Sequence, residues 1–144
     1  MADLAEAGYS GTPLPRKLGI GEDDSVVVVG ADDGFTDRLS ALLGDEVVVR
    51  TDLDDADLFD VIVAFFVWRA ELEDQIDRLR AKMAPACGLW IAWPKKAAKV
   101  PTDLSDNVVR EVALPTGLVD NKVCAIDQTW SGLRLVTRRA LRPR

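Results

Sequence analysis

Two adjacent lysines follow a tryptophan and a proline at the end of an apolar run, Gly88-Leu-Trp-Ile-Ala-Trp-Pro-Lys-Lys96. Ammonium groups attract anions and a flat indole can stack on a ring. Trp93, Lys95 and Lys96 therefore suit an anionic ligand that has a ring, such as a nucleotide or an acyl-adenylate-like molecule. Adjacent lysines are also common on solvated loops. Pro94 restricts the backbone beside them, and this constraint favours the binding interpretation.

Three other parts of the sequence could complete such a site. Arg69 follows the end of a long apolar run, and Trp130 lies in a short segment between two strand patterns. Tyr9, the only tyrosine, and its neighbour Ser10 lie between two glycines. A flap that closes on a ligand would explain the tyrosine, and a side chain that pins the N-terminal arm to the sheet would explain it equally well. Trp130 could instead fold back over an edge strand.

The chain has no histidine. This removes the usual general base near neutral pH and any Ser-His-Asp or Cys-His arrangement. Catalysis would have to use carboxylates, Lys, Tyr, Cys or proximity alone, and whether the protein is an enzyme stays open. Cys87 and Cys124 are far apart without metal-type spacing, so we expect both to be reduced and mostly buried.

The overall charge and hydropathy pattern exclude some classes of partner. A formal net charge of -6 argues against nucleic-acid binding, which needs a dominant basic surface. No apolar run approaches the roughly 20 residues of a membrane-spanning helix, and the N-terminus lacks the pattern of a signal peptide. We therefore expect a cytoplasmic protein with no membrane segment.

Two acidic clusters have alternative interpretations. Asp52, Asp54, Asp55 and Asp57 could supply oxygen ligands to a divalent cation, but the turn glycine and the distal glutamate of a calcium loop are missing. A solvated loop is the favoured interpretation, and no metal site is expected. The other pair, Asp32-Asp33, is expected to cap the helix that follows it.

The apolar periodicity predicts alternating strands and helices. An N-terminal helix over 12–19 would have Thr12 as N-cap, Pro13 at its first position and Gly19 at its end. The expected strands are Val26–Gly30, Glu46–Arg50, Asp60–Val67, Leu89–Trp93, Val123–Asp127 and Leu133–Thr137. The other expected helices are Phe35–Leu43, Ala70–Met83 and a last one capped by Ser105. The second and third strands are expected in the sheet interior, and the segment 85–88 is expected to separate a helix from a strand.

This alternation predicts an α/β fold of three layers, Rossmann-like, with a mostly parallel sheet that ends in an antiparallel hairpin. Residues 1–25 form an arm with a lead-in helix, 26–138 form one domain, and 139–144 form a basic tail that is expected to be disordered. The carboxyl ends of the strands would share one edge of the sheet with the hairpin turn, where ligands bind in such folds. Arg69, Lys95, Lys96 and Lys99 would then line a cleft there. Trp90 and Trp93, three apart in one strand, should face opposite sides, with Trp90 in the core.

Four sequence blocks carry a resemblance to a known family. They are Gly8-Tyr-Ser-Gly-Thr-Pro-Leu14, Trp93-Pro-Lys-Lys96, Leu114-Pro-Thr-Gly-Leu-Val-Asp-Asn-Lys-Val-Cys124 and Trp130-Ser-Gly-Leu-Arg134. In this order they resemble the bacterial domain of unknown function 3052, from about Gly8 to Arg138. The resemblance implies no catalytic residues, because the family has no assigned activity.

The order of elements also resembles a compressed class I methyltransferase fold, with one strand-helix unit missing between Arg50 and Asp60. This resemblance implies a site for S-adenosylmethionine at the turn Val28-Val-Gly-Ala-Asp-Asp-Gly34, where Gly30 and Gly34 are retained and Asp52 could hold the ribose hydroxyls. A valine stands where such enzymes have an acidic residue in the first strand.

These observations leave three hypotheses for the function. The first is non-catalytic binding of an anionic, nucleotide-like small molecule at the carboxyl edge of the sheet. The second is an S-adenosylmethionine-dependent methyltransferase with a degenerate cofactor site, in which proximity would carry catalysis. The third is a module that contacts a protein partner, or a second copy of the chain, through the surface of residues 114–122 or through the exposed edge of the hairpin.

Overall fold

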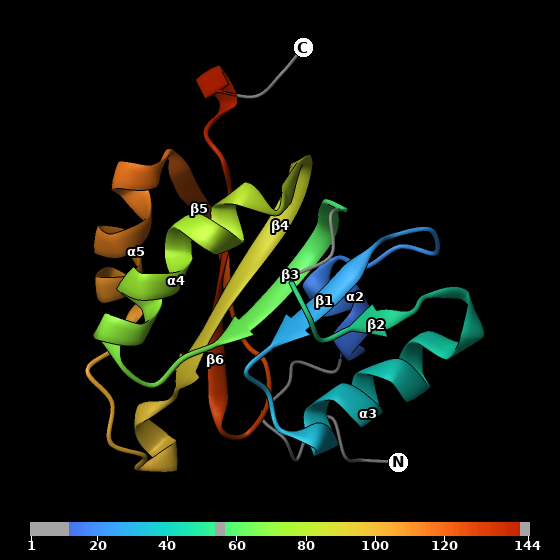
Figure 1. Cartoon of the computed structure of the whole chain (residues 1–144). Helices are drawn as coiled ribbons and strands as arrows, with labels where there is room; N and C mark the ends of the chain where they lie inside the picture. The colour runs from blue at the N-terminus through green and yellow to red at the C-terminus, as the bar shows by residue number, and fades with distance from the viewer. Residues whose placement is uncertain (1–11, 54–56, 142–144) are drawn as a thin grey trace.

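The computed structural model describes residues 12–53 and 57–141, which build one six-stranded sheet in the order β2-β1-β3-β4-β6-β5 with helices on both faces (Figure 1). The strands are β1 (Val26–Val29), β2 (Val49–Arg50), β3 (Phe59–Phe65), β4 (Met83–Pro94), β5 (Leu118–Ala125) and β6 (Trp130–Thr137). The α-helices are α2 (Leu14–Leu18), α3 (Asp33–Leu43), α4 (Arg69–Ala81) and α5 (Asp106–Ala113). The 3-10 helices are η1 (Gly44–Glu46), η2 (Lys96–Ala98), η3 (Leu114–Thr116) and η4 (Arg139–Leu141).

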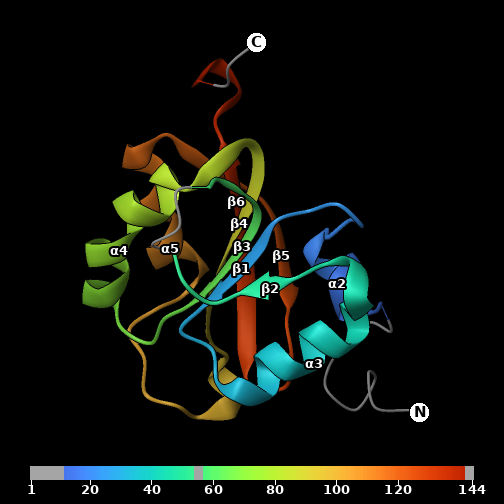
Figure 2. The same ribbon diagram turned by 45° about the vertical axis from the view of Figure 1, so that its right-hand side comes forward.

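The strand directions confirm the predicted fold class. β1 to β4 pair in parallel, and β6 pairs antiparallel with both β4 and β5. In Figure 2 the sheet separates α4 and α5 from α2 and α3. The closing hairpin therefore sits beside the last parallel strand, as the sequence predicted.

Each face of the sheet has its own apolar core. Leu72, Ile76 and Leu79 of α4 and Val109 of α5 pack on one face. Leu14 and Leu18 of α2, with Phe35 and Leu39 of α3, pack on the other. The predicted N-terminal arm thus contributes a helix to the core.

Trp90 and Trp93 belong to these two opposite cores, as their spacing predicted. Trp90 is fully buried, and its indole Nε1 donates to the carbonyl oxygen of Leu18 at 3.0 Å. This bond connects α2 to the centre of the sheet. Trp93 is 7% exposed, so both indoles are largely buried.

The capping predictions are confirmed for two helices. Asp32 Oδ1 accepts from the Phe35 N–H at 2.8 Å at the start of α3. Ser105 Oγ accepts from the Val108 N–H at 3.3 Å at the start of α5. The prediction for α2 was wrong by one residue, because Pro13 and not Thr12 is its N-cap, and its end at Gly19 is as expected.

Two predicted strand boundaries were wrong. The segment 46–50 was expected to be an interior strand, but η1 occupies its start and only two residues pair, at the edge of the sheet. The segment 85–88 was expected to precede the strand, but β4 begins at Met83 and runs through it. Pro85 is accommodated because the β3–β4 register shifts between Phe59 and Val61, so it interrupts no regular ladder.

The hairpin also begins earlier than predicted, with β5 at Leu118 and β6 at Trp130. Part of the expected C-terminal tail is ordered as η4. None of the helices in residues 12–53 and 57–141 combines the length and the apolar character needed to cross a membrane.

Candidate ligand-binding site

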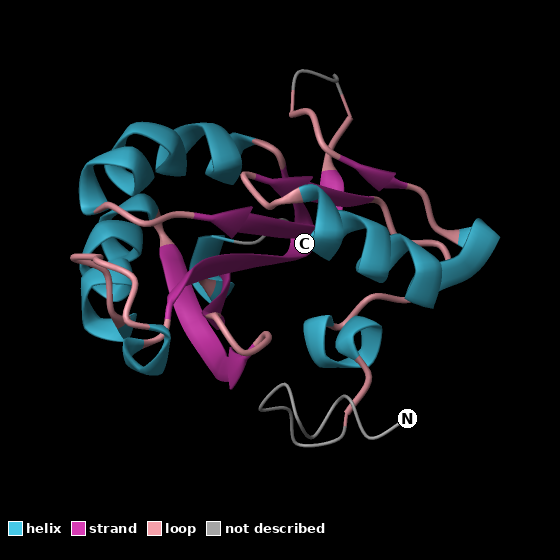
Figure 3. Cartoon of the chain, turned by 90° about the horizontal axis from the view of Figure 1, so that it is seen from below, coloured by secondary structure: helices cyan, strands magenta, loops and turns pink. Residues whose placement is uncertain are grey.

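The carboxyl ends of β1, β3 and β4 meet at one edge of the sheet, because these strands are parallel and in register. Pro94 at the end of β4 pairs with Trp130 at the start of β6, which brings the hairpin turn to the same edge. Figure 3 views the molecule from this side. The strand ends and the hairpin turn therefore share one edge of the sheet, as the sequence pattern predicted.

A cavity of about 560 Å³ lies at the end of β4, beneath the loop that leads to α5. Its lining combines the end of β4, the loop and the start of α5. The lining residues are Trp93, Pro94, Lys95, Lys96, Lys99, Val100, Pro101, Thr102, Leu104, Ser105, Asp106 and Ser131. The structure thus brings Trp93, Lys95 and Lys96 together, as predicted.

Backbone hydrogen bonds fix the lysine segment. The Lys95 N–H donates to the carbonyl oxygen of Thr129 at 2.8 Å, so the segment is attached to the hairpin turn. The Lys99 N–H donates to the Lys96 carbonyl oxygen at 3.1 Å and closes η2. Lys99 has a φ of 57°, a left-handed conformation that is unfavourable for a side chain larger than glycine. Within residues 12–53 and 57–141, none of the ammonium groups of Lys95, Lys96 and Lys99 has a hydrogen bond or an ion pair.

The opposite wall is the loop before α5. Thr102 Oγ1 donates to the carbonyl oxygen of Val67, just beyond β3, and accepts from the Leu104 N–H at 3.0 Å. Ser105 follows as the N-cap of α5. These contacts hold the loop over the cavity and connect it to the neighbouring strand.

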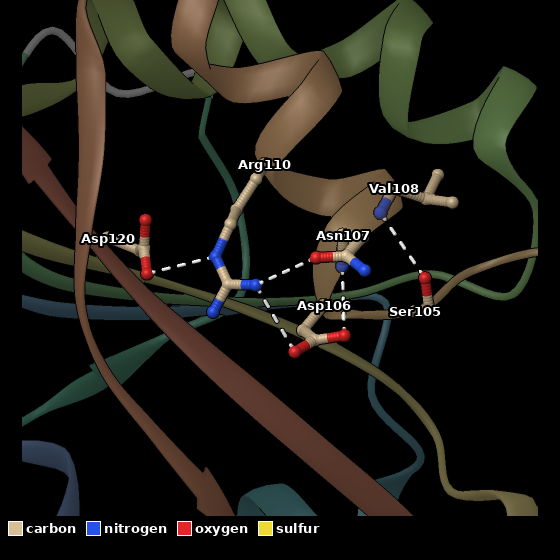
Figure 4. A network of polar contacts seen from close by, with 6 residues as sticks. All are labelled: Ser105, Asp106, Asn107, Val108, Arg110 and Asp120. Carbon is tan, nitrogen blue, oxygen red and sulfur yellow. Dashed lines mark hydrogen bonds and ion pairs between the residues drawn. The ribbon is translucent and has the colours of Figure 1, made fainter.

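Asp106 is the only carboxylate among the described lining residues, and both of its oxygens are engaged (Figure 4). Oδ1 accepts from the Asn107 N–H at 2.9 Å, and Oδ2 accepts from Arg110 Nη1 at 3.2 Å. Arg110 also donates from Nε to Asp120 Oδ2 at 3.0 Å. The hydrogen bond to Asp120 is the main cause of the raised pKa of Arg110, and Asp106 adds to it.

The same hydrogen-bond network gives part of the surface of residues 114–122 a structural role. Asp120 in β5 connects the hairpin to α5 through Arg110. Leu114 and Val123 are exposed, at 43% and 56%. A role of this surface in binding a partner stays a prediction, and a substitution of Asp120 would disturb the fold as well as the surface.

Arg69 does not line the cavity. Its guanidinium donates to Glu73 Oε2 at 3.0 Å and to Glu111 Oε1 at 2.9 Å, and these hydrogen bonds raise its pKa. Its backbone N–H donates to Asp103 Oδ1 at 2.7 Å. Arg69 lies at the predicted edge of the sheet, but the sequence pattern does not indicate that Glu73 and Glu111 would engage its guanidinium.

The Trp130 side chain does not line the cavity either. Its ring packs edge-on against Phe65, with centroids 5.0 Å apart and planes at 90°. It borders the core on the α2 and α3 face, whereas Trp93 borders the other core. Trp130 therefore covers the end of β3 and faces away from the cavity.

Gly30 directly follows β1 with a φ of 78°, and a Cβ there would lie 2.9 Å from the Phe65 carbonyl oxygen. Gly34 lies in the first turn of α3, where a Cβ would meet Asp32 Oδ1 at an ordinary 3.4 Å. Asp52 is exposed beyond β2. Tyr9 and Ser10 lie outside the described residues.

Sequence reasoning missed Thr102, Asp106 and Ser131 as parts of the site. The capping signal at Ser105 located the start of α5, but nothing in the spacing showed that the loop before it would face the lysines. Within the part of the chain that the structure describes, no group of three or more Cys, Asp or Glu side chains is arranged to hold a metal ion.

Comparisons with known proteins identify both the family and the fold. The model of a family described as a protein of unknown function, DUF3052, matches residues 15–139. No curated protein matches the chain by sequence.

Solved structures of methyltransferases share the fold at low sequence identity. A putative type 11 methyltransferase from Sulfolobus solfataricus is 12% identical with a TM-score of 0.64, and the match covers 91% of this chain and 93% of that one. The ribosomal protein L11 methylase from Lactobacillus delbrueckii subsp. bulgaricus is 15% identical with a TM-score of 0.60, covering 88% and 75%. Aeropyrum pernix fibrillarin, solved with natively bound S-adenosyl-L-methionine, is 12% identical with a TM-score of 0.60, covering 92% and 72%. At these identities the similarity establishes a class I methyltransferase-like fold.

Proposed function

The chain belongs to the DUF3052 family of proteins of unknown function, and we propose that it binds an anionic, nucleotide-like small molecule in the cavity at the end of β4. The observation that carries this proposal is the set of ammonium groups on Lys95, Lys96 and Lys99, which line one cavity without an acidic partner among the described residues. Positive charges that line one cavity attract an anion.

The other charged and polar groups that line the cavity are compatible with a bound anion. Asp106 would repel an anion if its oxygens were free. Arg110 and the Asn107 N–H engage both of them, so much of the negative charge is compensated. Ser105 and Ser131 add neutral hydrogen-bond donors to the lining.

The size of the cavity suits a small organic anion. Ligand sites typically occupy about 300–1,000 Å³, and this cavity measures about 560 Å³. Trp93 is only 7% exposed, so little of its ring is available for stacking. We therefore expect the lysines to supply most of the affinity.

Thermal unfolding with and without ATP tests the proposal. A ligand at about 100 times its dissociation constant adds roughly 2.7 kcal/mol to stability, which corresponds to a rise of several degrees in Tm. The double variant Lys95→Ala/Lys96→Ala should keep the Tm of the unliganded protein within a few degrees and lose the rise.

The control is Arg138→Ala/Arg139→Ala, which removes the same charge from exposed residues that do not line the cavity. It should retain the rise with ATP. Equal loss of the Tm rise in both double variants would mean that ATP binding depends only on the net charge of the protein. That result would contradict the proposed site.

A second candidate function is binding of S-adenosylmethionine, followed by methyl transfer. The observation in its favour is the strand order, which matches the methyltransferase fold with one strand-helix unit missing, together with the left-handed turn at Gly30. A Tm rise with millimolar S-adenosylmethionine would support it. Gly34→Ala should weaken that rise without destabilising α3, because its Cβ meets no atom closer than 3.4 Å. No rise in the unmodified protein would exclude this candidate.

A further inference from the structure

A second cavity lies on the other face of the sheet, between α2 and the hairpin of β5 and β6. It measures about 270 Å³ and shares no lining residue with the cavity at the end of β4. Its lining residues are Arg16, Lys17, Leu18, Gly19, Asn121, Lys122 and Arg134. The set contains four cationic side chains and no acidic one, in a chain with a formal net charge of -6.

Arg134 occupies a position that depends on a glycine in the neighbouring strand. A Cβ on Gly88 would lie 2.5 Å from Arg134 Nε and 2.7 Å from Nη2. Glycine inside a strand is otherwise unfavourable, and it commonly marks a site where another group approaches the backbone closely. Gly88 thus leaves room for the guanidinium directly on β4. Within the described residues this half-buried guanidinium has no ion-pair partner.

Lys17, in α2, adds another cationic side chain to the lining. It is 5% exposed, and its Nζ donates to the Ala125 carbonyl oxygen at 2.9 Å. Burial lowers the pKa of Lys17, and the charges of Lys95 and Lys122 lower it further, against the opposing effect of Cys124. Lys122 approaches from β5, where its Nζ donates to the Lys17 carbonyl oxygen at 3.4 Å.

We propose that this second cavity binds the phosphoryl group of a small molecule. The guanidinium of Arg134 would present its planar set of N–H donors to two phosphate oxygens, and Lys122 would supply a further positive charge. Asn121 adds an exposed amide at the rim. A volume of about 270 Å³ leaves room for part of the molecule that carries the phosphate. The net negative charge of the protein opposes a long polyanion such as nucleic acid, so a small phosphomonoester is the favoured ligand.

The test is a calorimetric titration of the full-length protein with inorganic phosphate and, separately, with ribose 5-phosphate, at constant ionic strength adjusted with sodium chloride. Tighter binding of ribose 5-phosphate would identify a phosphomonoester as the ligand, and equal binding would identify free phosphate. Absence of binding by both probes at millimolar concentration would overturn the proposal.

Two substitutions at Arg134 and its neighbour connect binding to this cavity. Arg134→Gln removes the charge and should weaken phosphate binding by a factor of about ten or more, since hydrogen bonds to charged groups contribute about 1.5–3 kcal/mol. Gly88→Ala keeps every charge and displaces only the guanidinium, so it should weaken binding several-fold. Lys122→Gln, at an exposed position, repeats the test if Arg134→Gln does not fold.

The matched control is Arg139→Gln, which makes the same substitution at an exposed residue that lines neither cavity. Its affinity for phosphate should stay within about twofold of that of the unmodified protein, because Arg134 is retained. Loss of phosphate binding in Lys95→Ala/Lys96→Ala, together with unchanged binding in Arg134→Gln, would place the phosphate at the end of β4 and overturn the second site. Failure of ATP to bind the first cavity would leave this result unaffected.

Discussion

Gly30 follows β1 in a left-handed conformation, and its replacement by alanine should have two separate energetic costs. The first is the backbone cost of a φ of 78° for a residue with a Cβ, which is roughly 1–2 kcal/mol. The second is the contact of the new Cβ with the Phe65 carbonyl oxygen at 2.9 Å. That oxygen belongs to an interior strand and cannot rotate away as a flexible side chain would, so we assign it about 1–3 kcal/mol, as for an overpacked core.

Gly19 provides a matched control for the backbone cost. It has a φ of 77°, and a Cβ there would meet no atom within 4 Å. Gly19→Ala should therefore destabilise the protein by about 1–2 kcal/mol and Gly30→Ala by about 2–5 kcal/mol. The difference between the two variants measures the close approach of β1 and β3 at the edge where the ligand is proposed to bind.

Urea unfolding followed by tryptophan fluorescence gives both free energies. With a slope of about 1–3 kcal/mol per molar urea, a difference of about 2 kcal/mol moves the midpoint by about 1 M. Equal midpoints for Gly30→Ala and Gly19→Ala would refute the reasoning, because the Phe65 carbonyl oxygen would then impose no constraint. Gly30 would in that case be free to admit a ligand.

This prediction also changes how a cofactor site should be tested. A larger residue at Gly30, such as valine, would destabilise the turn whether or not a cofactor binds there. Loss of S-adenosylmethionine binding in such a variant would therefore have two explanations. Gly34→Ala avoids the difficulty, since its backbone is helical and its Cβ is accommodated.

Three further results are expected. Lys99→Gly should raise the free energy of unfolding by up to about 1 kcal/mol in urea titrations, because glycine adopts a φ of 57° without strain; lower stability would contradict this reasoning. The same variant should weaken ATP binding. Burial raises the pKa of Cys87 to about 12, so iodoacetamide at pH 8.5 should label the half-buried Cys124 first; faster labelling of Cys87 would contradict its burial in the core. The stability that protonated Cys87 contributes below about pH 9 should be lost as the pH rises from 9 toward 12. Asp32→Ala should cost about 1 kcal/mol in thermal unfolding through loss of the α3 cap, more than Asp33→Ala; a reversed order would assign the cap to Asp33.

The sequence was sufficient for the parts of the fold that local chemistry determines. The four valines of β1 show no alternation and lie between two cores, and Ser105 caps the helix that its type and position predicted. The alternation of apolar runs was enough to predict parallel strands and the final hairpin. These features depend on residues that are close in the sequence.

Features that depend on tertiary pairing could not be predicted. Proline usually interrupts a strand, yet Pro85 lies within β4 because the register shift opposite it leaves no ladder to interrupt. Val48 belongs to an apolar run that favours an interior strand, but it is 74% exposed beside an edge strand. The same local sequence pattern can form an interior strand or lie at the edge of the sheet. Pairing with neighbouring strands determines which of the two forms.

The same distinction applies to the two cavities. Lys95, Lys96 and Trp93 are adjacent in the sequence, so their grouping could be recognised before the fold was known. The second cavity combines Lys17, Lys122 and Arg134, which come from three separate segments. No spacing in the sequence indicates that group, because the crossing of α2 over the hairpin creates it.

The two outer strands of the sheet bear on how the protein avoids aggregation. Exposed strand edges can pair with other copies of a chain. β2 offers only two residues for such pairing. β5 is longer, but its register is irregular between Asp120 and Lys122, and the charge of Lys122 lies beside the exposed Val123. Lys122 therefore places a charge on this edge, and an apolar replacement there is expected to leave a more continuous apolar edge that could pair with other copies of the chain.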